Sequence, residues 1–352
     1  MRFILMTAVL LLQPMLISAA DVEVVIGGLL ENEGGSWKPD QGPLISPFGV
    51  AFDSSETMWI VELEGGRVHR LSADGSLSLA GGATEAAYVG DGGPLLQARF
   101  NGMHNCAVLP NDDLLIADSW NHVIRRVDAK SGLISTLAGT GSAGFSGDGG
   151  AATQAKFDFV MCITLTPKAD RVHIADLKNL RIREVNLGTG TVRTVAGNGE
   201  RGVPADGARA TEAPLVDPRA VAEDAQGILY VLERGGHALR AVLPDGTIRT
   251  VAGTGMRGFA DGQADVAEFG SPKHICIGPR GQVYIADDQN GAIRVYDPEE
   301  KSVRTVLGRA FGDAAIRLKN PHGVTWHKGW LYVVDMGNNR ILRVREPGAE
   351  KN

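Results

Sequence analysis

Five side chains in separate parts of the sequence are of the types that bind metals and anions. Three are the histidines His104, His274 and His322, and two are the cations Arg219 and Lys273. Three imidazoles from different segments can hold a Zn²⁺ or a similar ion and leave one coordination position open. Arg and Lys beside such an ion would suit a carboxylate or another anionic substrate group. These residues therefore predict a ligand site, provided that the fold brings them together.

Neighbouring positions add an amide and an apolar wall. Asn105 follows His104, and the corresponding places elsewhere hold Phe48, Val160 and Met161. Polar groups that converge beside an apolar wall are typical of a ligand pocket. The alternative is that the histidines are hydrogen-bonded lining around trapped water. The predicted ligand site comprises Phe48, His104, Asn105, Arg219, Lys273, His274 and His322, and the predicted metal ligands are His104, His274 and His322.

A glycine motif offers a different chemistry. Gly139-x-Gly141-x-x-Gly144 follows the strand-like run LISTL and has the spacing of a dinucleotide-binding loop. A Rossmann site uses one such turn, which opens a long helix. Here the motif recurs at 197–202 and at 253–258, and each copy leads into a connector with room for a turn or two of helix at most. We therefore interpret the glycines as turns of a repeat and expect no NAD.

The repeat consists of four short strand-like segments. The segments MWIVE, LLIAD, RVHIAD, ILYVLE, QVYIAD and LYVVD recur every 48 to 58 residues, and each ends in an acidic residue. One apolar segment precedes each of them and two follow, with Gly, Asp, Asn or Pro between the pieces. This is the pattern of strands and turns. Four strands per unit around an axis predict an all-β, six-bladed β-propeller of antiparallel blades.

The last unit lacks its fourth strand, and a candidate for it lies at the other end of the chain. The segment VEVVIGG at 22–28 matches TVRTVAG of the other units. We therefore expect the N-terminal strand to complete the sixth blade. Nothing in the sequence resembles a linker, so 21–346 is interpreted as one propeller domain and 347–352 as a C-terminal tail.

The strand-end acids, Glu62, Asp118, Asp176, Glu233, Asp287 and Asp335, are interpreted as structural because all six units have one. We expect each carboxylate to cap a turn and to pair with an arginine of the third strand, such as Arg125, Arg183, Arg240 or Arg294. Glu62 and Glu233 have a longer arm that could reach into the channel. A second acidic series in the connectors, Asp91, Asp148, Asp206, Asp261 and Asp313, is interpreted as Asx-type turns that accept N–H groups of their own loop.

The repeats resemble the NHL-repeat family of six-bladed propellers, of the secreted bacterial kind. The matching signature is P-x-G-V-A, strand-A-D, N-x-R-I-R and I-x-T-V-A-G-x-G, as in QVYIADDQNGAIRVY followed by SVRTVLG. The resemblance covers nearly all of the chain after residue 20, and a more distant one extends to teneurin NHL domains. It implies the fold, whereas function on this fold depends on the site.

Two enzyme families with six-bladed propellers are also similar. In the peptidyl-hydroxyglycine lyases, propeller histidines bind zinc and one characteristic segment is Pro-His, which Pro321-His322 resembles. The position of that family's catalytic Asp is Gly323 here. The gluconolactonase-like propellers bind calcium through a Glu of the first inner strand, where this chain has Phe48-Gly49. The possible cofactor is thus one divalent metal, Zn²⁺ or Ca²⁺.

The chain ends and the composition bound the partners. Residues 1–20 have a positive start, an apolar run at 3–12, and Ser18 and Ala20 at the places of a signal-peptidase site, so we expect a cleaved export signal. The protein is then periplasmic, secreted or at the cell surface. The net charge of −6, without a run of Lys or Arg, argues against a nucleic-acid partner. No later segment is apolar enough to span a membrane, and we expect a monomer.

Three cysteines in an exported chain leave at least one unpaired. Cys106, Cys162 and Cys276 lie inside apolar runs, so all three are predicted to be buried and free.

Three functions remain open from the sequence. The leading one is an exported propeller that binds a small anionic molecule, a glycan or a protein at the channel face. The second is a metal-dependent lyase or hydrolase that uses the three histidines. The third is a structural interaction module, as in teneurin-like proteins.

Overall fold

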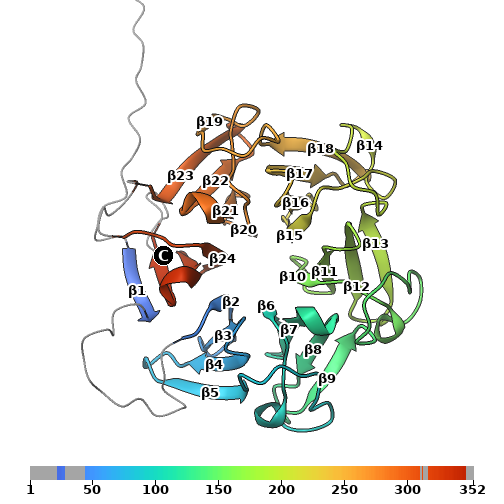
Figure 1. The fold of residues 1–352 in the computed structure, drawn as a ribbon, viewed down its shortest axis with the longest axis vertical. Helices are drawn as coiled ribbons and strands as arrows, with labels where there is room; N and C mark the ends of the chain where they lie inside the picture. Colours follow the sequence, from blue (N-terminus) through green and yellow to red (C-terminus); the bar gives the residue numbers. More distant parts are fainter. Residues whose placement is uncertain (1–21, 28–43, 310, 312–315, 346–352) are drawn as a thin grey trace, which may run out of the picture.

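Six β-sheets stand around a central axis like the blades of a propeller (Figure 1). This computed structural model describes residues 22–27, 44–309, 311 and 316–345. The predicted all-β architecture with four antiparallel strands per blade is confirmed. The predicted export signal (1–20), the tail (347–352) and Asp313 lie outside the described residues.

The first three blades have four strands each. Blade 1 comprises β2 (Pro47–Phe52), β3 (Met58–Glu62), β4 (Arg67–Leu71) and β5 (Leu77–Gly82). Blade 2 comprises β6 (Met103–Val108), β7 (Leu114–Asp118), β8 (Val123–Val127) and β9 (Ile134–Ala138). Blade 3 comprises β10 (Val160–Leu165), β11 (Arg171–Asp176), β12 (Arg181–Asn186) and β13 (Val192–Ala196).

The next two blades each carry a short extra strand from the preceding connector. Blade 4 comprises β15 (Pro218–Glu223), β16 (Leu229–Glu233), β17 (Ala238–Val242) and β18 (Thr247–Ala252), with β14 (Ala208–Arg209) beside β18. Blade 5 comprises β20 (His274–Ile277), β21 (Val283–Asp287), β22 (Ala292–Asp297) and β23 (Ser302–Gly308), with β19 (Gly262–Gln263) beside β23. Five 3₁₀ turns are described: η2 (Leu95–Gln97), η3 (Ser119–Asn121), η4 (Ala152–Gln154), η5 (Asp288–Asn290) and η6 (Met336–Asn338).

Blade 6 joins the two ends of the chain. It comprises β24 (Pro321–His327), β25 (Trp330–Asp335), β26 (Arg340–Val344) and the N-terminal β1 (Val22–Gly27). β1 pairs antiparallel with β26, from Val22 opposite Val344 to Gly27 opposite Arg340. The prediction that the N-terminal strand completes the sixth blade is confirmed.

The repeated glycines make the turns that begin each connector. Gly139, Gly141 and Gly144 all have positive φ, at 99°, 82° and 144°. A Cβ atom on Gly139 would lie 2.5 Å from the carbonyl oxygen of His122, so only glycine fits there. The connector then pairs with the outer strand of the next blade, as where Gly149 N–H donates to Val192 O. It contains the three-residue turn η4 rather than a long helix.

Each connector ends in the same three anchors before it enters an inner strand. The first is an apolar side chain, which is buried before five of the blades, as Phe157 and Phe269 are at 0% exposed, and partly buried before blade 6, where it is Leu318. The second is an N–H group that donates to the strand-end carboxylate of the same blade, at 2.6–2.7 Å in all six blades. The third is a residue in the left-handed region, with φ between 48° and 64°, at Ser46, Gly102, Phe159, Asp217, Ser271 and Asn320.

An arginine neutralises each of these carboxylates, as the sequence predicts. The six pairs span 2.6–3.4 Å, and every acid is 0% exposed. The arginine comes from the middle of the third strand in blades 2 to 5 and from its start in blades 1 and 6, as Arg67 and Arg340. Glu62 and Glu233 form the same kind of ion pair, so their longer side chains contact arginines and do not reach into the channel.

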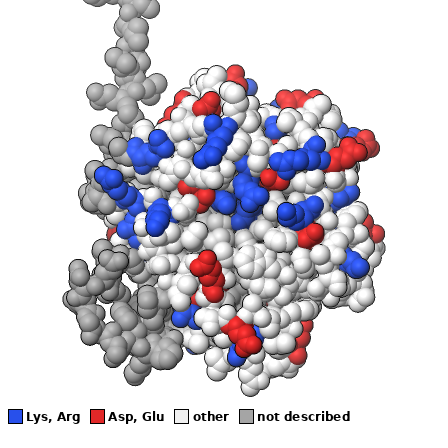
Figure 2. Space-filling model, in the orientation of Figure 1, with Lys and Arg blue, Asp and Glu red and all other residues white. Residues whose placement is uncertain are grey.

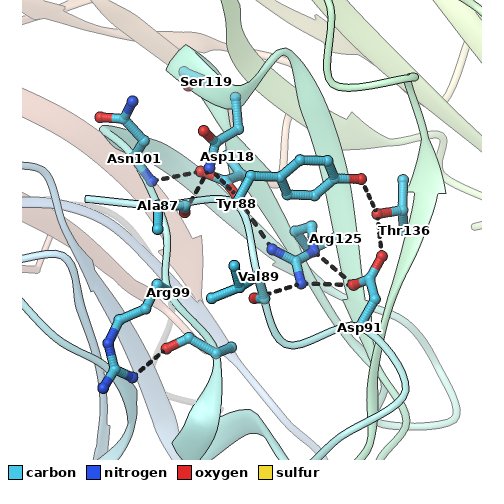
Figure 3. Close-up of polar contacts among 12 residues, drawn as sticks. Ala87, Tyr88, Val89, Asp91, Arg99, Asn101, Asp118, Ser119, Arg125 and Thr136 are labelled. Atoms are coloured by element: carbon cyan, nitrogen blue, oxygen red, sulfur yellow. Dashed lines mark hydrogen bonds and ion pairs between the residues drawn. The ribbon is translucent and has the colours of Figure 1, made fainter. Parts of the chain in front are cut away.

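The connector acids behave differently from the Asx turns that the sequence predicts, and that interpretation is wrong for the blades where the contacts are described. Asp91 accepts from Arg125 at 2.6 Å and from the Thr136 hydroxyl at 2.6 Å (Figure 3). Asp148 and Asp261 make the corresponding ion pairs, and Asp206 accepts from the N–H of Thr250. The connector crosses the outer edge of the next blade, which brings its carboxylate to that blade's arginine.

Removing one of these carboxylates tests its contribution to stability. We expect Glu233→Ala to lower the free energy of unfolding by about 3–5 kcal/mol, because it leaves Arg240 buried without a carboxylate and frees the N–H of Val216. Urea unfolding followed by circular dichroism measures the change. The control is the exposed Glu212, which lies on the connector that carries Val216. Equal stability of Glu212→Ala and Glu233→Ala would contradict the anchoring role.

Candidate functional site

In five of the six blades, a β-bulge at the start of the inner strand aims one side chain at the mouth of the channel. In β2, Pro47 and Gly49 pair with consecutive residues of β3, and Phe48 between them is left out of the ladder. The same shift occurs in β6, β10, β15 and β24. An extra residue of this kind re-aims its side chain. The six residues at this position, Lys273 of blade 5 included, are Phe48, His104, Met161, Arg219, Lys273 and His322, and we call them the upper layer.

The next residue of each strand forms a second layer, deeper in the channel. It contains Asn105, Cys162 and His274, and Gly or Ala in the other three blades. The register therefore separates the predicted metal ligands, with His104 and His322 above and His274 below. It also corrects the expected apolar wall: Val160 takes the place of the prolines of other blades and is buried in the core, so Met161 is the side chain that blade 3 contributes to the upper layer.

The upper layer is closed by stacked rings. The Phe48 ring stacks on His322 with centroids 3.5 Å apart, and the edge of His104 meets Phe48 at 4.8 Å. His104 Nδ1 donates to the carbonyl oxygen of Gly102 at 2.7 Å, which fixes its orientation. Burial lowers the pKa of both histidines well below the usual value, with a further contribution from the nearby Arg219 cation. Both rings are therefore neutral at pH 7.

The lower layer is a hydrogen-bonded bridge across the channel. The Asn105 amide donates to His274 Nε2 at 3.0 Å, and its oxygen accepts from the N–H of Ile163 at 3.1 Å. The Cys162 sulfur lies 3.7 Å from the same His274 nitrogen. Burial lowers the pKa of His274 to about 4, so this bridge is uncharged. It links blades 2, 3 and 5 across the channel.

Arg219 is a buried cation that contacts no carboxylate among the described residues, although the charge of Asp288 acts on it from a distance. It is 2% exposed, and its guanidinium contacts His322 Nε2 at 2.7 Å and the Met161 carbonyl at 3.2 Å. Its Nε is buried and has no hydrogen-bond partner in the described part of the chain. Burial lowers its pKa to about 10. By contrast, the buried arginines of the third strands are all paired with acids.

Lys273 adds a second cation beside it. Burial and the charge of Arg219 lower the pKa of Lys273 to about 8. Its Nζ lies 4.0 Å from an oxygen of Asp288, which is a weak contact. Arg234 follows the strand-end acid of blade 4 and also contributes positive charge to Arg219 and Lys273. In the orientation of Figure 1, Lys and Arg side chains lie around the centre of the ring (Figure 2).

This arrangement suits an anion better than a metal cation. Among the described residues, no group of three or more His, Cys, Asp or Glu side chains could hold a metal ion. His322 Nε2 accepts from Arg219, His274 Nε2 accepts from Asn105, and the buried guanidinium would repel a divalent ion. The metal centre at His104, His274 and His322 stays a prediction that only a metal analysis tests.

Two charged residues of this face were not among the site residues predicted from the sequence. Arg234 and Asp288 directly follow the strand-end acids of blades 4 and 5, where other blades have Leu, Ser or Met. That departure from the repeat was the available signal.

Trp120 lies half-exposed with its ring against Gly102, and the centroids of the Trp120 and His104 rings are 6.0 Å apart. The three cysteines are free, as predicted. Cys106 and Cys162 are buried, whereas Cys276 is only partly buried, so the prediction of burial is wrong for Cys276. No helix in the described ranges is both long and apolar enough to span a bilayer.

The two kinds of buried arginine give opposite expectations. Arg219→Met should raise the free energy of unfolding by about 1–3 kcal/mol in anion-free buffer, because it removes a buried charge that lacks a counterion. The matched variant Arg240→Met should lower it by about 3–5 kcal/mol, because it strands Glu233. Urea titration of both measures the effect. A destabilised Arg219→Met would show that the guanidinium is compensated within the fold.

The chain is similar in sequence to parts of longer proteins. The chain is 28% identical over 255 residues to "Protein SUPPRESSOR OF QUENCHING 1, chloroplastic" of Arabidopsis thaliana, covering 66% of the chain and 24% of that protein. It is 27% identical over 269 residues to human "NHL repeat-containing protein 2", covering 65% and 36%. It is 26% identical over 217 residues to zebrafish Teneurin-3, covering 52% and 8%. The chain thus spans well under two thirds of these relatives. No protein-family model matches it.

Solved structures share the fold at low sequence identity. An auxiliary nutrient binding protein from Bacteroides ovatus matches with a TM-score of 0.66 and 14% identity, covering 92% of this chain and 76% of that one. A gluconolactonase from Xanthomonas campestris gives 0.60 and 13%, covering 93% and 89%. Virginiamycin B lyase from Staphylococcus aureus gives 0.55 and 12%, covering 87% and 98%. The predicted resemblance is confirmed: the chain is a six-bladed β-propeller similar in sequence to NHL repeat-containing proteins and to teneurins.

Proposed function

We propose that this propeller binds a small anionic ligand, carrying a carboxylate or a phosphate, at the upper mouth of its channel. The observation that carries the proposal is Arg219, a guanidinium that the fold buries without an ion pair to any carboxylate among the described residues. A buried charge without a partner costs several kcal/mol. The fold retains this cost at one position only among its third-strand and channel arginines. A ligand anion that arrives from solution would supply the missing charge.

The surroundings of Arg219 support an anion of modest size. Lys273, with 22% of its side chain exposed, and Arg234, with 36%, lie nearer the surface than Arg219 and can contact a ligand directly. The stacked rings of Phe48 and His322 fill the centre, so the ligand would rest on this layer and not pass through it. Trp120 offers an exposed aromatic face at the edge. Arg and Lys together give a bidentate and a single-point contact for such a group.

The proposal also includes export, since residues 1–20 have the pattern of a signal peptide. One neighbour in fold is described as an auxiliary nutrient binding protein, and others as a lyase and a gluconolactonase. On a fold that hosts unrelated functions, the site decides among them. Binding without catalysis is the simplest function of a cationic surface whose histidines are neutral and already engaged.

A panel of probe ions tests the anion site. Acetate, citrate, phosphate and sulfate are titrated calorimetrically against the full chain, with glucose as the neutral probe. We expect at least one anion to bind, and Arg219→Met and Lys273→Met each to weaken it about tenfold or more, since charge-assisted hydrogen bonds contribute about 1.5–3 kcal/mol. The exposed Lys168, in the loop between β10 and β11, gives the control variant Lys168→Met.

Two outcomes would overturn the anion site. One is that none of the four anions binds. The other is that Arg219→Met and Lys168→Met bind an anion equally well. If elemental analysis instead finds one equivalent of Zn²⁺ or Ca²⁺ that is lost in His104→Ala and His322→Ala, the metal-dependent lyase or hydrolase replaces the binding function.

The pH dependence of binding identifies the lysine. Because the pKa of Lys273 is about 8, its ammonium is charged at pH 7 and loses its proton as the pH rises past 8. Anion affinity should therefore fall between pH 7 and pH 9. Lys273→Arg should flatten this fall, because the guanidinium stays charged over the whole range. A fall that is the same in the wild type and in Lys273→Arg would assign it to another group.

A further inference from the structure

The channel has a second end, on the opposite face of the ring. Below the Asn105–His274 bridge lies a cavity of about 380 Å³. It is lined by the last residues of the inner strands, among them Phe52, Glu223 and His327. The cavity therefore opens where the inner strands end, whereas the cationic upper layer lies where they begin. Its volume is at the lower end of the range for small-molecule sites.

The walls of this cavity combine apolar and polar surface in nearly equal parts. Aliphatic side chains such as Ile163 and Val324 line it, with Cys106 and Cys276 between them. Aromatic rings that are themselves held in place lie at the rim. Phe52 stacks on the His327 imidazole with centroids 4.0 Å apart. Trp326, another lining residue, stacks on the buried Tyr284 at 5.5 Å. Rigid rings and aliphatic walls suit a compact hydrocarbon or aromatic body.

Glu223 is the one carboxylate among the lining residues. Its Oε2 and the Nε2 atom of His173 are 2.6 Å apart, and no described residue donates to its Oε1. His173 is 2% exposed, and its Nδ1 lies 3.7 Å from Glu184. The histidine therefore holds the carboxylate at the rim and leaves one oxygen for a ligand. This hydrogen bond is also the main cause of the lowered pKa of Glu223, which keeps the carboxylate charged at neutral pH.

The nearby basic side chains are engaged with other acids. Arg171 contacts Glu184 at 3.0 Å and Asp170 at 3.4 Å. His327, the rim imidazole, lies 2.9 Å from Glu56. Neither reaches Glu223 with an ion pair in the described ranges. The lining thus presents a single negative charge beside apolar and aromatic surface, the reverse of the upper mouth.

We propose that this cavity is a second ligand site, which takes a small primary amine with a compact apolar body. The ammonium group donates to the free oxygen of Glu223, and the body packs against the aliphatic wall and the ring of Trp326. An ammonium near Trp326 also gains from the negative face of the indole. The site is distinct from the anion site, because no upper-layer residue lines the cavity, whose lining includes Asn105 and His274.

Three probes of one shape and different charge test the site. Benzylamine, benzyl alcohol and benzoate are titrated against the full chain at pH 7 by calorimetry and by ligand-observed NMR. We expect benzylamine to bind at least tenfold more tightly than benzyl alcohol, and benzoate to bind more weakly than both. Glu223→Gln should bring benzylamine to the level of benzyl alcohol, because it removes the charge and keeps the shape. Glu212→Gln, on an exposed connector, is the matched control.

A second variant keeps the test decisive if Glu223→Gln does not fold. Ala107→Phe enlarges a lining residue that is partly buried, so its ring should fill the cavity and abolish binding of both benzylamine and benzyl alcohol. Anion binding at the upper mouth should be unchanged, which separates failure of this site from failure of the proposed function. The inference is wrong if benzoate binds as well as benzylamine, or if Ala107→Phe leaves benzylamine binding intact.

Discussion

A buried carboxylate at the end of each second strand receives an N–H group from the connector, and the position of every channel residue depends on this contact. The donating N–H lies three residues before the upper-layer residue in all six blades. The acid is in turn held by an arginine from the third strand. Burying such a charge is costly, and burial indeed raises the pKa of Asp118 to about 6. The backbone is therefore the same in each blade, while the side chain that it delivers is free to vary.

The sequence was sufficient for the architecture because the repeat states each strand six times. Even the pairing of β1 with β26 could be predicted, since the last unit lacked its fourth strand and the N-terminal segment matched the fourth strands of the other units. The strand-end acids and their arginines could be predicted for the same reason. What the repeat did not show was the offset of one residue at each bulge. That offset separates His104 and His322 from His274, and it removes Val160 from the channel.

The remaining errors have the same origin. A pattern of residue types says which loop carries an acid but not which blade that loop crosses, so the pairing of Asp91 with Arg125 could not be derived. The role of Arg219 could likewise not be predicted, because the sequence does not show which acidic residues lie next to a given arginine in the fold. In the structure, the buried arginines of the third strands are paired with carboxylates, whereas Arg219 contacts only a neutral ring and a carbonyl among the described residues. Stability and binding therefore make opposite demands at this position.

The closure of the ring has a consequence for where the molecule can yield. β1 is the outermost strand of blade 6, so the junction between the two chain ends lies on the circumference, as far from the axis as the fold allows (Figure 1). If this strand detaches, β24 still keeps its pairing with β25, and both channel ends keep their walls. Opening of the ring at the β1–β26 pair would therefore not involve the inner strands around the channel. A propeller closed in this way can fray at its perimeter while the ligand surfaces at its centre keep their shape.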